Sequence, residues 1–446
     1  MGTGGVAYRT DRSTALCNTA GGNGSDMPPF LKKPAPRMVR IRRALPGEHI
    51  ADPRRDVRER LLAAGLAPKI SRGDRIAITA GSRGMGGLIH LLAGVADAVK
   101  QCGGEPFIIP AMGSHGGATP EGQARILQLL GLEESVVGAP VRATMDTVTF
   151  GKAKNGAVAH LDRFAHEADG VIVLGRTKTH PESDEGLASG LLKMVVIGLG
   201  KQRGAQEAHS HGLWDSVRHV PEVVLPNAKV LFGVAVVENG YRQPVVIEVV
   251  PPLYDAFLES DERLLKVAKP LVAKLPFDNL HVLIVDEIGK TVSGSGMDLN
   301  VIGKYRATGK GPHEPEIKRI VALSLTKPSL GNGLGIGLAD FTTRRFLQQY
   351  DPVVSYINLL TATEPDNTTH EGPLPLALDT DREAIEVAMY SALADGDARV
   401  CRIKSTVEMA EMWISEALIA EARRDASINI ESEPQELPFN SAGNLW

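Results

Sequence analysis

The sequence predicts an α/β protein of two α/β domains with largely parallel sheets and an active-site cleft between them. Three observations predict this class. The 446 residues are too many for one ordinary domain. Short apolar runs alternate with segments of helical periodicity, which is typical of strand–helix–strand units. The first apolar runs each end in a polar turn, most of them rich in glycine, and ligands bind at the carboxyl ends of parallel strands.

The first domain is expected over residues 38–275. Its helices have apolar residues at helical spacing, and its strands are short apolar runs that end at turn residues. In chain order we expect a helix over 56–66, a strand over 75–81, a helix over 86–102, a strand over 106–112, a helix over 120–130 and a strand over 170–175.

The second domain is expected over residues 276–403. Apolar runs at 281–287 and 319–325 predict two strands. Residues 340–349 and 381–395 have helical periodicity. This alternation again indicates an α/β sheet.

Three segments lie outside the two domains. Within residues 404–425, an amphipathic pattern over 406–424 predicts a helix that packs back on the first domain. Residues 1–37 have no periodic apolar face and are rich in Gly and Pro, so they are expected to form a disordered tail. The polar residues 426–446 are expected to form a second, frayed tail.

The composition disfavours several classes of protein. Hydrophobic residues make up 43%, charged residues 23% and the net charge is −4, as in soluble globular proteins. Aromatic residues make up only 4%, which leaves few side chains to stack on bases and disfavours nucleic-acid binding. No apolar stretch approaches the roughly 18 residues of a membrane span. Cys17, Cys102 and Cys401 form no Cys-x-x-Cys pair, so we expect a cytoplasmic protein without disulfides.

The first two turns carry one candidate residue each. Arg83 lies among glycines in Gly81-Ser82-Arg83-Gly84, where a guanidinium and backbone N–H groups can converge on one anion. The alternative is a tight turn with a surface arginine. His115 lies between glycines, has few neighbours to pack on, and points to a general acid or base. Thr119 is expected to cap the helix that begins at Pro120.

The third turn carries more candidates. Lys193 lies inside an apolar run, where an unpaired ammonium is costly, so it needs an anion or a covalent attachment. The alternative is a lysine that faces solvent. His180 precedes this run, and His209 and His211 follow it. The latter two do not share a helical face, which disfavours a two-histidine zinc site.

These residues, in the order Arg83, His115, His180, Lys193 and His209, resemble the nickel-dependent lactate racemase family, whose cofactor is the nickel-pincer nucleotide. The resemblance extends over roughly residues 40–400 and includes the two-domain architecture. It implies that Lys193 holds the cofactor covalently as a thioamide. It also implies that His209 ligates Ni(II), in a square-planar site that suits this ion.

The resemblance further implies roles for the other turn residues. His115 and His180 would be the two acid/base groups that flank the substrate, and Arg83 would hold its carboxylate. The cofactor would accept a hydride from C2 and return it to either face of a 2-keto acid. Residues that would contact the cofactor are Ser82, Gly113, Gly190, Asp298 and Asn300.

The second domain departs from the family pattern. Ile302 and Gly303 stand where the family has Tyr and Gln, which predicts a more open pocket and a substrate larger than lactate, for example a sugar acid. The cation that binds the substrate carboxylate could be Lys290, Lys304 or Arg306. The binding partner is therefore expected to be a small 2-hydroxy acid, and a homodimer is compatible with this interpretation.

Two alternatives to a racemase or epimerase stay open. A metal-dependent hydrolase could use the histidine cluster, although it would need three protein ligands and has no use for Lys193. A non-catalytic relative could bind the cofactor through Lys193 and His209 without turning over a substrate.

Overall fold

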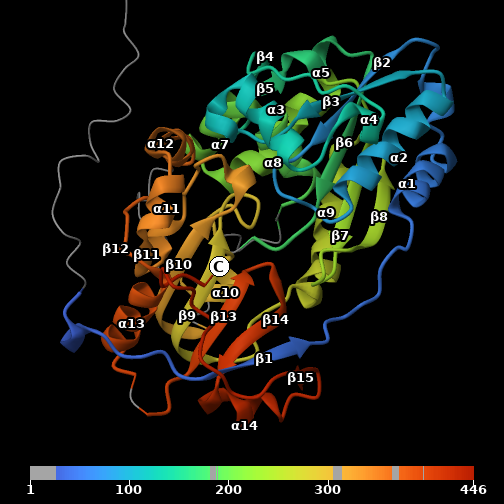
Figure 1. Ribbon diagram of the computed structural model, residues 1–446. Helices are drawn as coiled ribbons and strands as arrows, with labels where there is room; N and C mark the ends of the chain where they lie inside the picture. Colours follow the sequence, from blue (N-terminus) through green and yellow to red (C-terminus); the bar gives the residue numbers. More distant parts are fainter. Residues whose placement is uncertain are drawn as a thin grey trace, which may run out of the picture.

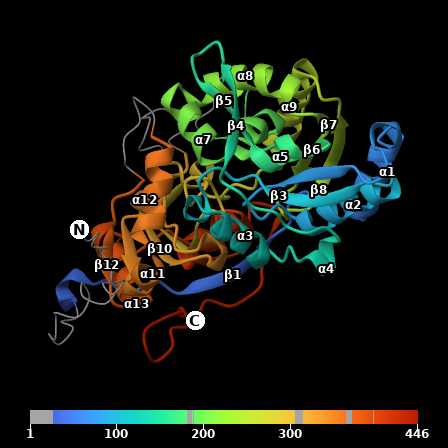
Figure 2. The ribbon, with the colours of Figure 1, turned by 90° about the horizontal axis from the view of Figure 1, so that it is seen from above.

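The computed structural model describes residues 27–180, 187, 189–304, 314–363, 371–394 and 396–445. Within these ranges the chain forms two α/β domains, as predicted, each built on one large and mostly parallel sheet. Figure 1 shows the first domain at the upper right and the second at the lower left, and Figure 2 shows both from above. No helix within the described ranges is long and apolar enough to cross a membrane.

The sheet of the first domain has the strand order β3-β2-β6-β7-β8, and only the β7–β8 pair is antiparallel. Alternate residues face opposite sides: Ile76 and Ile78 pack in the core with α2, whereas Ala77 packs in the core with α8. The strands are β2 (Arg75–Ala80), β3 (Glu105–Pro110), β6 (Gly170–Arg176), β7 (Val230–Glu238) and β8 (Pro244–Val250).

Helices cover both faces of this sheet, with α1 and α2 in one core and α6, α8 and α9 in the other. A hairpin of β4 (Thr147–Lys152) and β5 (Val158–Asp162) lies outside the sheet. The helices are α1 (Pro53–Ala63), α2 (Leu88–Gln101), α3 (Pro120–Leu129), α4 (Glu134–Val137), α5 (Arg163–Glu167), α6 (Leu191–Lys193), α7 (Lys201–Ser210), α8 (Leu213–Val224) and α9 (Tyr254–Ala268).

The sheet of the second domain has the order β12-β11-β10-β9-β13-β14-β1-β15. It is parallel from β12 to β13 and antiparallel from β13 to β15. The strands are β1 (Met38–Arg43), β9 (Asn279–Ile288), β10 (Glu316–Leu325), β11 (Phe341–Thr343), β12 (Leu376–Leu378), β13 (Val400–Ser405), β14 (Glu408–Ser415) and β15 (Ile428–Ile430).

One helix of the second domain, α12, reaches across to the first domain and lies beside α7 (Figure 1, Figure 2). Its Asn358 Nδ2 donates to Ser114 Oγ at 2.9 Å, which joins the two domains next to the His115 turn. The helices of this domain are α10 (Leu299–Ile302), α11 (Arg344–Gln349), α12 (Pro352–Thr361), α13 (Asp381–Ser391) and α14 (Ile419–Ala422). The short turns of helix are η1 (Pro29–Leu31), η2 (Ala67–Lys69), η3 (Gly116–Ala118), η4 (Met194–Gly198), η5 (Leu225–Asn227), η6 (Lys269–Leu271), η7 (Lys327–Ser329), η8 (Ile336–Leu338) and η9 (Glu416–Leu418).

The predicted helix over 406–424 is wrong. Residues 408–415 form strand β14, which pairs with β13 and β1 in the second domain, and only the short turns η9 and α14 that follow are helical. Met412 and Ile414 are buried, whereas Glu411 is exposed, so the apolar residues alternate as they do in a half-buried strand. Pairing on both edges overrides the local helical tendency.

The predicted start of the first domain and the two predicted tails are also wrong. Strand β1 lies in the sheet of the second domain, between β14 and β15, and Figure 1 shows it crossing beneath that domain. Of the predicted tail 1–37, residues 27–37 are described and pack on α13, where the Met27 N–H donates to Glu383 at 2.7 Å. The tail predicted at 426–446 contains β15 and buries Leu437, so it is an ordered edge of the sheet.

Candidate active site

Three turns bring the predicted residues to one edge of the first sheet. β2, β3 and β6 are parallel, so the turns that follow them lie side by side. The first turn contains Ser82 and Arg83, the second contains His115, and the third contains His180 and leads to Lys193. The predicted residues of the three turns therefore lie together at the carboxyl edge of this sheet.

The backbone of the His115 turn depends on glycine. Gly116 has φ of 67°, and a Cβ there would collide with the backbone of Gly122 and Gln123. This close approach folds the turn onto the start of α3. The predicted cap is confirmed, because Thr119 Oγ1 accepts from the Gly122 N–H at 3.1 Å.

A buried polar network supports this turn from below. Lys201 is 0% exposed, and its Nζ donates to Pro110 O at 2.6 Å and to Gln123 Oε1 at 2.8 Å. Its Nζ also lies 3.3 Å from Asp162 Oδ2. The other end of Gln123 donates to Gly113 O at 2.8 Å and to His115 O at 3.3 Å. The backbone of the turn is thus held by fully buried hydrogen bonds.

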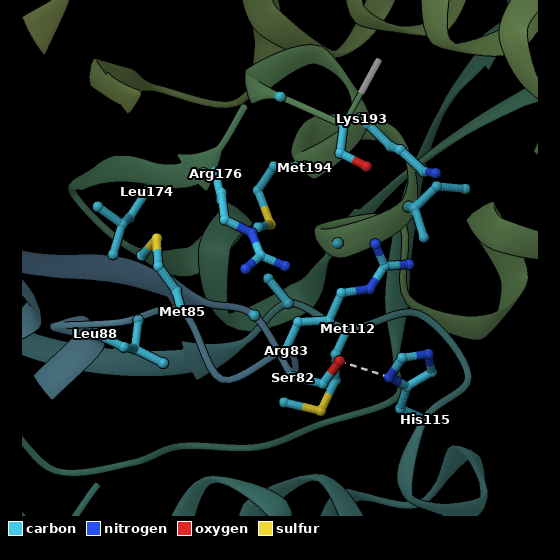
Figure 3. A pocket seen from close by; sticks show the side chains of 17 residues that line it. Ser82, Arg83, Met85, Leu88, Met112, His115, Leu174, Arg176, Lys193 and Met194 are labelled. Carbon is cyan, nitrogen blue, oxygen red and sulfur yellow. Dashed lines mark hydrogen bonds between the residues drawn. The ribbon is translucent and has the colours of Figure 1, made fainter. Parts of the chain in front are cut away.

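His115 is held as a neutral imidazole. Burial, together with the nearby charges of Lys290 and Arg83, lowers its pKa well below the ordinary value. Ser82 Oγ lies 2.6 Å from Nδ1, so the hydroxyl orients the ring and occupies that nitrogen (Figure 3). Nε2 is therefore the nitrogen that can exchange a proton with a ligand.

His180 is oriented by aromatic packing. Its ring meets Trp214 of α8 edge-on, with the centroids 4.9 Å apart. Burial lowers its pKa well below the ordinary value, and the charge of Lys193 acts in the same direction. Two backbone hydrogen bonds join Lys178, two residues before His180, to Ser189. Both predicted acid/base groups are thus neutral near pH 7.

Lys193 lies in the site and not in the hydrophobic core. It ends α6 and is followed by η4, one turn of π-helix, a local distortion that is frequent at functional sites. Its Nζ lies 4.8 Å from the centre of the Trp214 ring. Asp261 holds the start of this helix by accepting from the N–H groups of Leu191 and Leu192, and burial raises its pKa to about 7.

The site is rich in positive charge. Burial and the charge of Arg176 lower the pKa of Arg83 to about 10, and both residues line the first cavity. Figure 3 shows both groups pointing into the same space. Arg176 donates to Glu238 at 2.7 Å, and Lys178 pairs with Asp298 of the second domain at 2.6 Å. An anion bound here would relieve the repulsion between Arg83 and Arg176.

Two adjoining cavities make up the site. The first, of about 800 Å³, is lined by residues of the first domain that include Ser82, Gly190 and several apolar side chains (Figure 3). The second, of about 940 Å³, lies between the two domains and includes Gly113 and His209. Both cavities are lined by Arg83, Met112, His115, Lys193 and Ile197. The predicted cleft between the domains is therefore present.

The residues predicted from the second domain divide into two groups. Lys290 lines the second cavity, whereas Lys304 pairs with Asp340 at 2.7 Å and is not among the described residues that line it. Arg306 lies outside the described residues. Asp298 caps α10 and binds Lys178, and Asn300 donates to Asp298, so both contribute to the joint between the domains.

The expected opening of the pocket by Ile302 and Gly303 is wrong. Ile302 is fully buried in the core of the second domain, and Gly303 ends α10 with φ of 63°. Neither residue is among the described residues that line the two cavities. The size of the site comes instead from the space between the domains.

Of the two later histidines, only His209 lines the cavity between the domains, whereas His211 is exposed and contacts Glu207. In the described part of the chain, no three His, Cys, Asp or Glu side chains are grouped as metal ligands. A hydrolase that uses the histidine cluster would need such a group. A metal bound at His209 would need its other ligands from a cofactor or from outside the described residues.

Four residues that line or support the candidate site were given no role from the sequence: Trp214, Glu371, Gln123 and Lys201. Trp214 contacts both His180 and Lys193, and Glu371 lines the second cavity. No local motif marks them, since each reaches the site only through the packing of distant elements. Lys201 offered one signal, a lysine directly after Gly198-Leu199-Gly200 at the end of the apolar run.

Comparisons with known proteins give two matches. Residues 89–322 match the family model described as "Domain of unknown function (DUF362)". This range contains His115, His180, Lys193 and His209, but not Arg83 or Glu371. No protein with a curated description matches this sequence. Among solved structures, the chain is similar to the lactate racemase apoprotein from Thermoanaerobacterium thermosaccharolyticum, with 13% identity and a TM-score of 0.45, covering 83% of this chain and 99% of that chain.

Proposed function

This chain belongs to the family described as "Domain of unknown function (DUF362)", and we propose that it catalyses the inversion of C2 of a 2-hydroxy acid. The proposal rests on the chemistry of the residues that line its cavity. The enzyme is then an isomerase, a racemase or epimerase. It uses a nickel-pincer nucleotide attached covalently to Lys193, with His209 as the protein ligand of nickel. This resemblance to the nickel-dependent lactate racemases is carried by the residues of the three turns.

One observation carries the proposal. Two histidines with lowered pKa, an arginine and a half-buried lysine come from the three turns and line one cavity between the domains. They are His115, His180, Arg83 and Lys193. Ionisable groups with shifted pKa values that gather in one cleft are typical of functional sites, so this grouping favours a catalytic role.

The residues present fit the proposed cofactor. The paired guanidinium groups of Arg83 and Arg176 favour a ligand with a phosphate or carboxylate. Met85, Leu88 and Met194 line the first cavity and would contact an aromatic ring. Lys193 supplies an amine for attachment between the two cavities. When bound, the nickel-pincer nucleotide supplies a reversible hydride acceptor for the C2 hydrogen.

The chain's own residues supply the proton transfers and the orientation. Neutral His115, with Nδ1 held by Ser82, can accept the 2-hydroxyl proton through Nε2. Neutral His180 can do the same for the opposite configuration. Arg83 and Lys290 line the same cavity and would bind the carboxylate, which positions C2 between the two imidazoles.

We infer that the substrate is larger than lactate. The cavity between the domains is bordered on its second-domain side by Ser295, Thr361 and Thr363, which carry hydroxyl groups. Such groups would hydrogen-bond the hydroxyls of a longer chain. A sugar acid such as gluconate fits this wall better than a three-carbon acid.

The proposal is tested by intact mass and turnover. Protein purified from a host that makes the cofactor should carry an adduct of several hundred daltons, and Lys193→Ala should lack it. Exposed Lys266→Ala is the matched control and should keep the adduct. Isomerisation of gluconate, malate and lactate is then followed with each pure stereoisomer. If Lys193→Ala keeps its nickel and its absorbance, the proposal is wrong.

Histidine variants separate an enzyme from a cofactor-binding relative. His115→Gln and His180→Gln should keep the adduct and lose isomerisation by roughly 100-fold or more, because each removes a proton-transfer group. A chain that loads the cofactor but isomerises none of the three acids in its wild-type form would favour the non-catalytic alternative.

A further inference from the structure

The wall of the cavity opposite the three turns carries a carboxyl group, Glu371. Its backbone carbonyl accepts from the N–H groups of Gly335 and Gly337 at 3.1 and 3.2 Å, which fixes the residue at the turn that leads into η8. Its side chain lines the cavity and is hydrogen-bonded to Ser295. Burial raises its pKa, against the effect of Lys290 and Ser295.

The groups around Glu371 are rigidly placed. Gly335 has φ of 98°, and a Cβ there would collide with the carbonyl of Ser295, so the two turns are in close contact. Lys290 is 6% exposed; its N–H donates to Ser329 Oγ at 3.0 Å, and its ammonium donates to Gly294 O. Preorganised groups of this kind discriminate between ligands because they do not adapt.

The charge of Lys290 influences two different groups. It lowers the pKa of His115 and opposes the rise in the pKa of Glu371. A carboxylate bound to Lys290 would therefore share the cavity with the His115 imidazole and the Glu371 carboxyl. All three residues line the same cavity.

We propose that Glu371 and Ser295 form a specificity subsite that selects polyhydroxy monocarboxylates and rejects 2-hydroxy dicarboxylates. The subsite rests on the proposed function, whose substrate class it narrows. The substrate carboxylate binds Lys290 and Arg83, and its distal hydroxyls donate to Glu371. The hydroxyls of Thr361 and Thr363 donate to backbone carbonyls, and Thr361 Oγ1 also accepts from Gln202, so Thr363 is the better acceptor for the distal hydroxyls.

The chemistry of Glu371 explains both parts of this selectivity. A carboxylate is a strong acceptor for hydroxyl donors, and its hydrogen bonds are stronger than neutral ones. The same negative charge repels a second carboxylate on a ligand, and Lys290 is already engaged by the first one. The Glu371 carboxylate oxygens would thus attract the distal hydroxyls of a polyhydroxy acid and repel the second carboxylate of a dicarboxylic acid.

The test compares gluconate with malate in cofactor-loaded protein. Glu371→Gln keeps the shape of the side chain but removes its charge. It should lower kcat/KM for gluconate roughly tenfold and raise that for malate roughly tenfold, the loss or gain of one charged interaction of about 1.4 kcal/mol. Ser295→Ala should shift the ratio in the same direction by less. Exposed Glu436→Gln is the matched control and should leave the ratio unchanged.

These outcomes distinguish the failure of the proposed subsite from the failure of the proposed reaction. If the wild type and Glu371→Gln isomerise both acids in the same ratio, the subsite is wrong and the proposed function stands. If no variant isomerises any acid, equilibrium dialysis with radiolabelled gluconate and malate measures the same ratio as binding. A shift with Glu371→Gln then supports the subsite, and an unchanged ratio overturns it. Thermal unfolding of each variant confirms that it is folded.

Discussion

The two histidine turns lie at the same sheet edge but are held by different forces. The His115 turn is held by a polar network in which Lys201 and Gln123 are buried beneath the backbone. The His180 segment is held by the ring of Trp214 and by the pair between Lys178 and the second domain. The first turn therefore depends on the core of its own domain, and the second on aromatic packing and on the arrangement of the domains.

This difference predicts which substitutions will destabilise each turn most. A buried polar network is stabilising only while every member is satisfied, so its loss has a large effect. An aromatic edge contact contributes less to the free energy of folding, so its loss has a smaller effect. The His115 turn should consequently be more rigid, and changes beneath it should cost more than changes beside His180.

The largest effect is expected from Lys201→Met. Removal of the ammonium leaves Asp162 buried without its partner and removes the donor to Pro110 and Gln123. We expect a loss of about 3–5 kcal/mol in the free energy of unfolding, measured by urea denaturation, together with lower turnover. Exposed Lys266→Met should change the stability by less than about 0.5 kcal/mol. A loss of under about 1 kcal/mol in Lys201→Met would show that the network does not support the turn.

The location of the site could be predicted because it depends on local patterns. Apolar runs that end in glycine-rich turns predicted the strands, and a parallel sheet then brings Arg83, His115 and Lys193 to one edge. The partners of these residues could not be predicted in the same way. Gln123 and Trp214 lie on helices, and they reach the site only because those helices pack where they do.

The errors in the fold have the same origin. Met38–Arg43 and Glu408–Ser415 pair with each other although 364 residues separate their ends. No local sequence pattern predicts this pairing. The apolar residues of the second segment are also spaced so that either a helix or a strand would be amphipathic. The sequence also predicted that Ile302 and Gly303 open the pocket. Ile302 instead lies in the core, and the cavity is bordered by residues of both domains.

A smaller effect is expected from pH on the His115 turn. The folded-state pKa of His115 lies well below that of the unfolded chain, which is about 6.5. The unfolded state therefore binds more protons as the pH falls below about 6.5, and the stability contributed by the neutral ring is lost on acidification. Between pH 7.5 and 5.5 the wild type should lose more stability than His115→Gln, by up to roughly 1.4 kcal/mol for each pH unit below 6.5.

Urea unfolding at the two pH values measures this difference. Exposed His49→Gln is the matched control and should follow the wild type. If His115→Gln and the wild type lose stability in parallel, the ring is not held neutral by its surroundings, and its role as a base near pH 7 has no support from the site.

The smallest effect on stability is expected beside His180. Trp214→Leu keeps an apolar side chain but removes the edge contact with His180 and the ring beneath Lys193. We expect a loss of about 0.5–1.5 kcal/mol in the free energy of unfolding, well below that of Lys201→Met. Turnover should nevertheless fall by more than this loss implies, because the His180 imidazole and the Lys193 amine lose a shared support. Trp214→Phe restores an aromatic edge and should recover most of the activity; if it does not, packing alone does not orient His180.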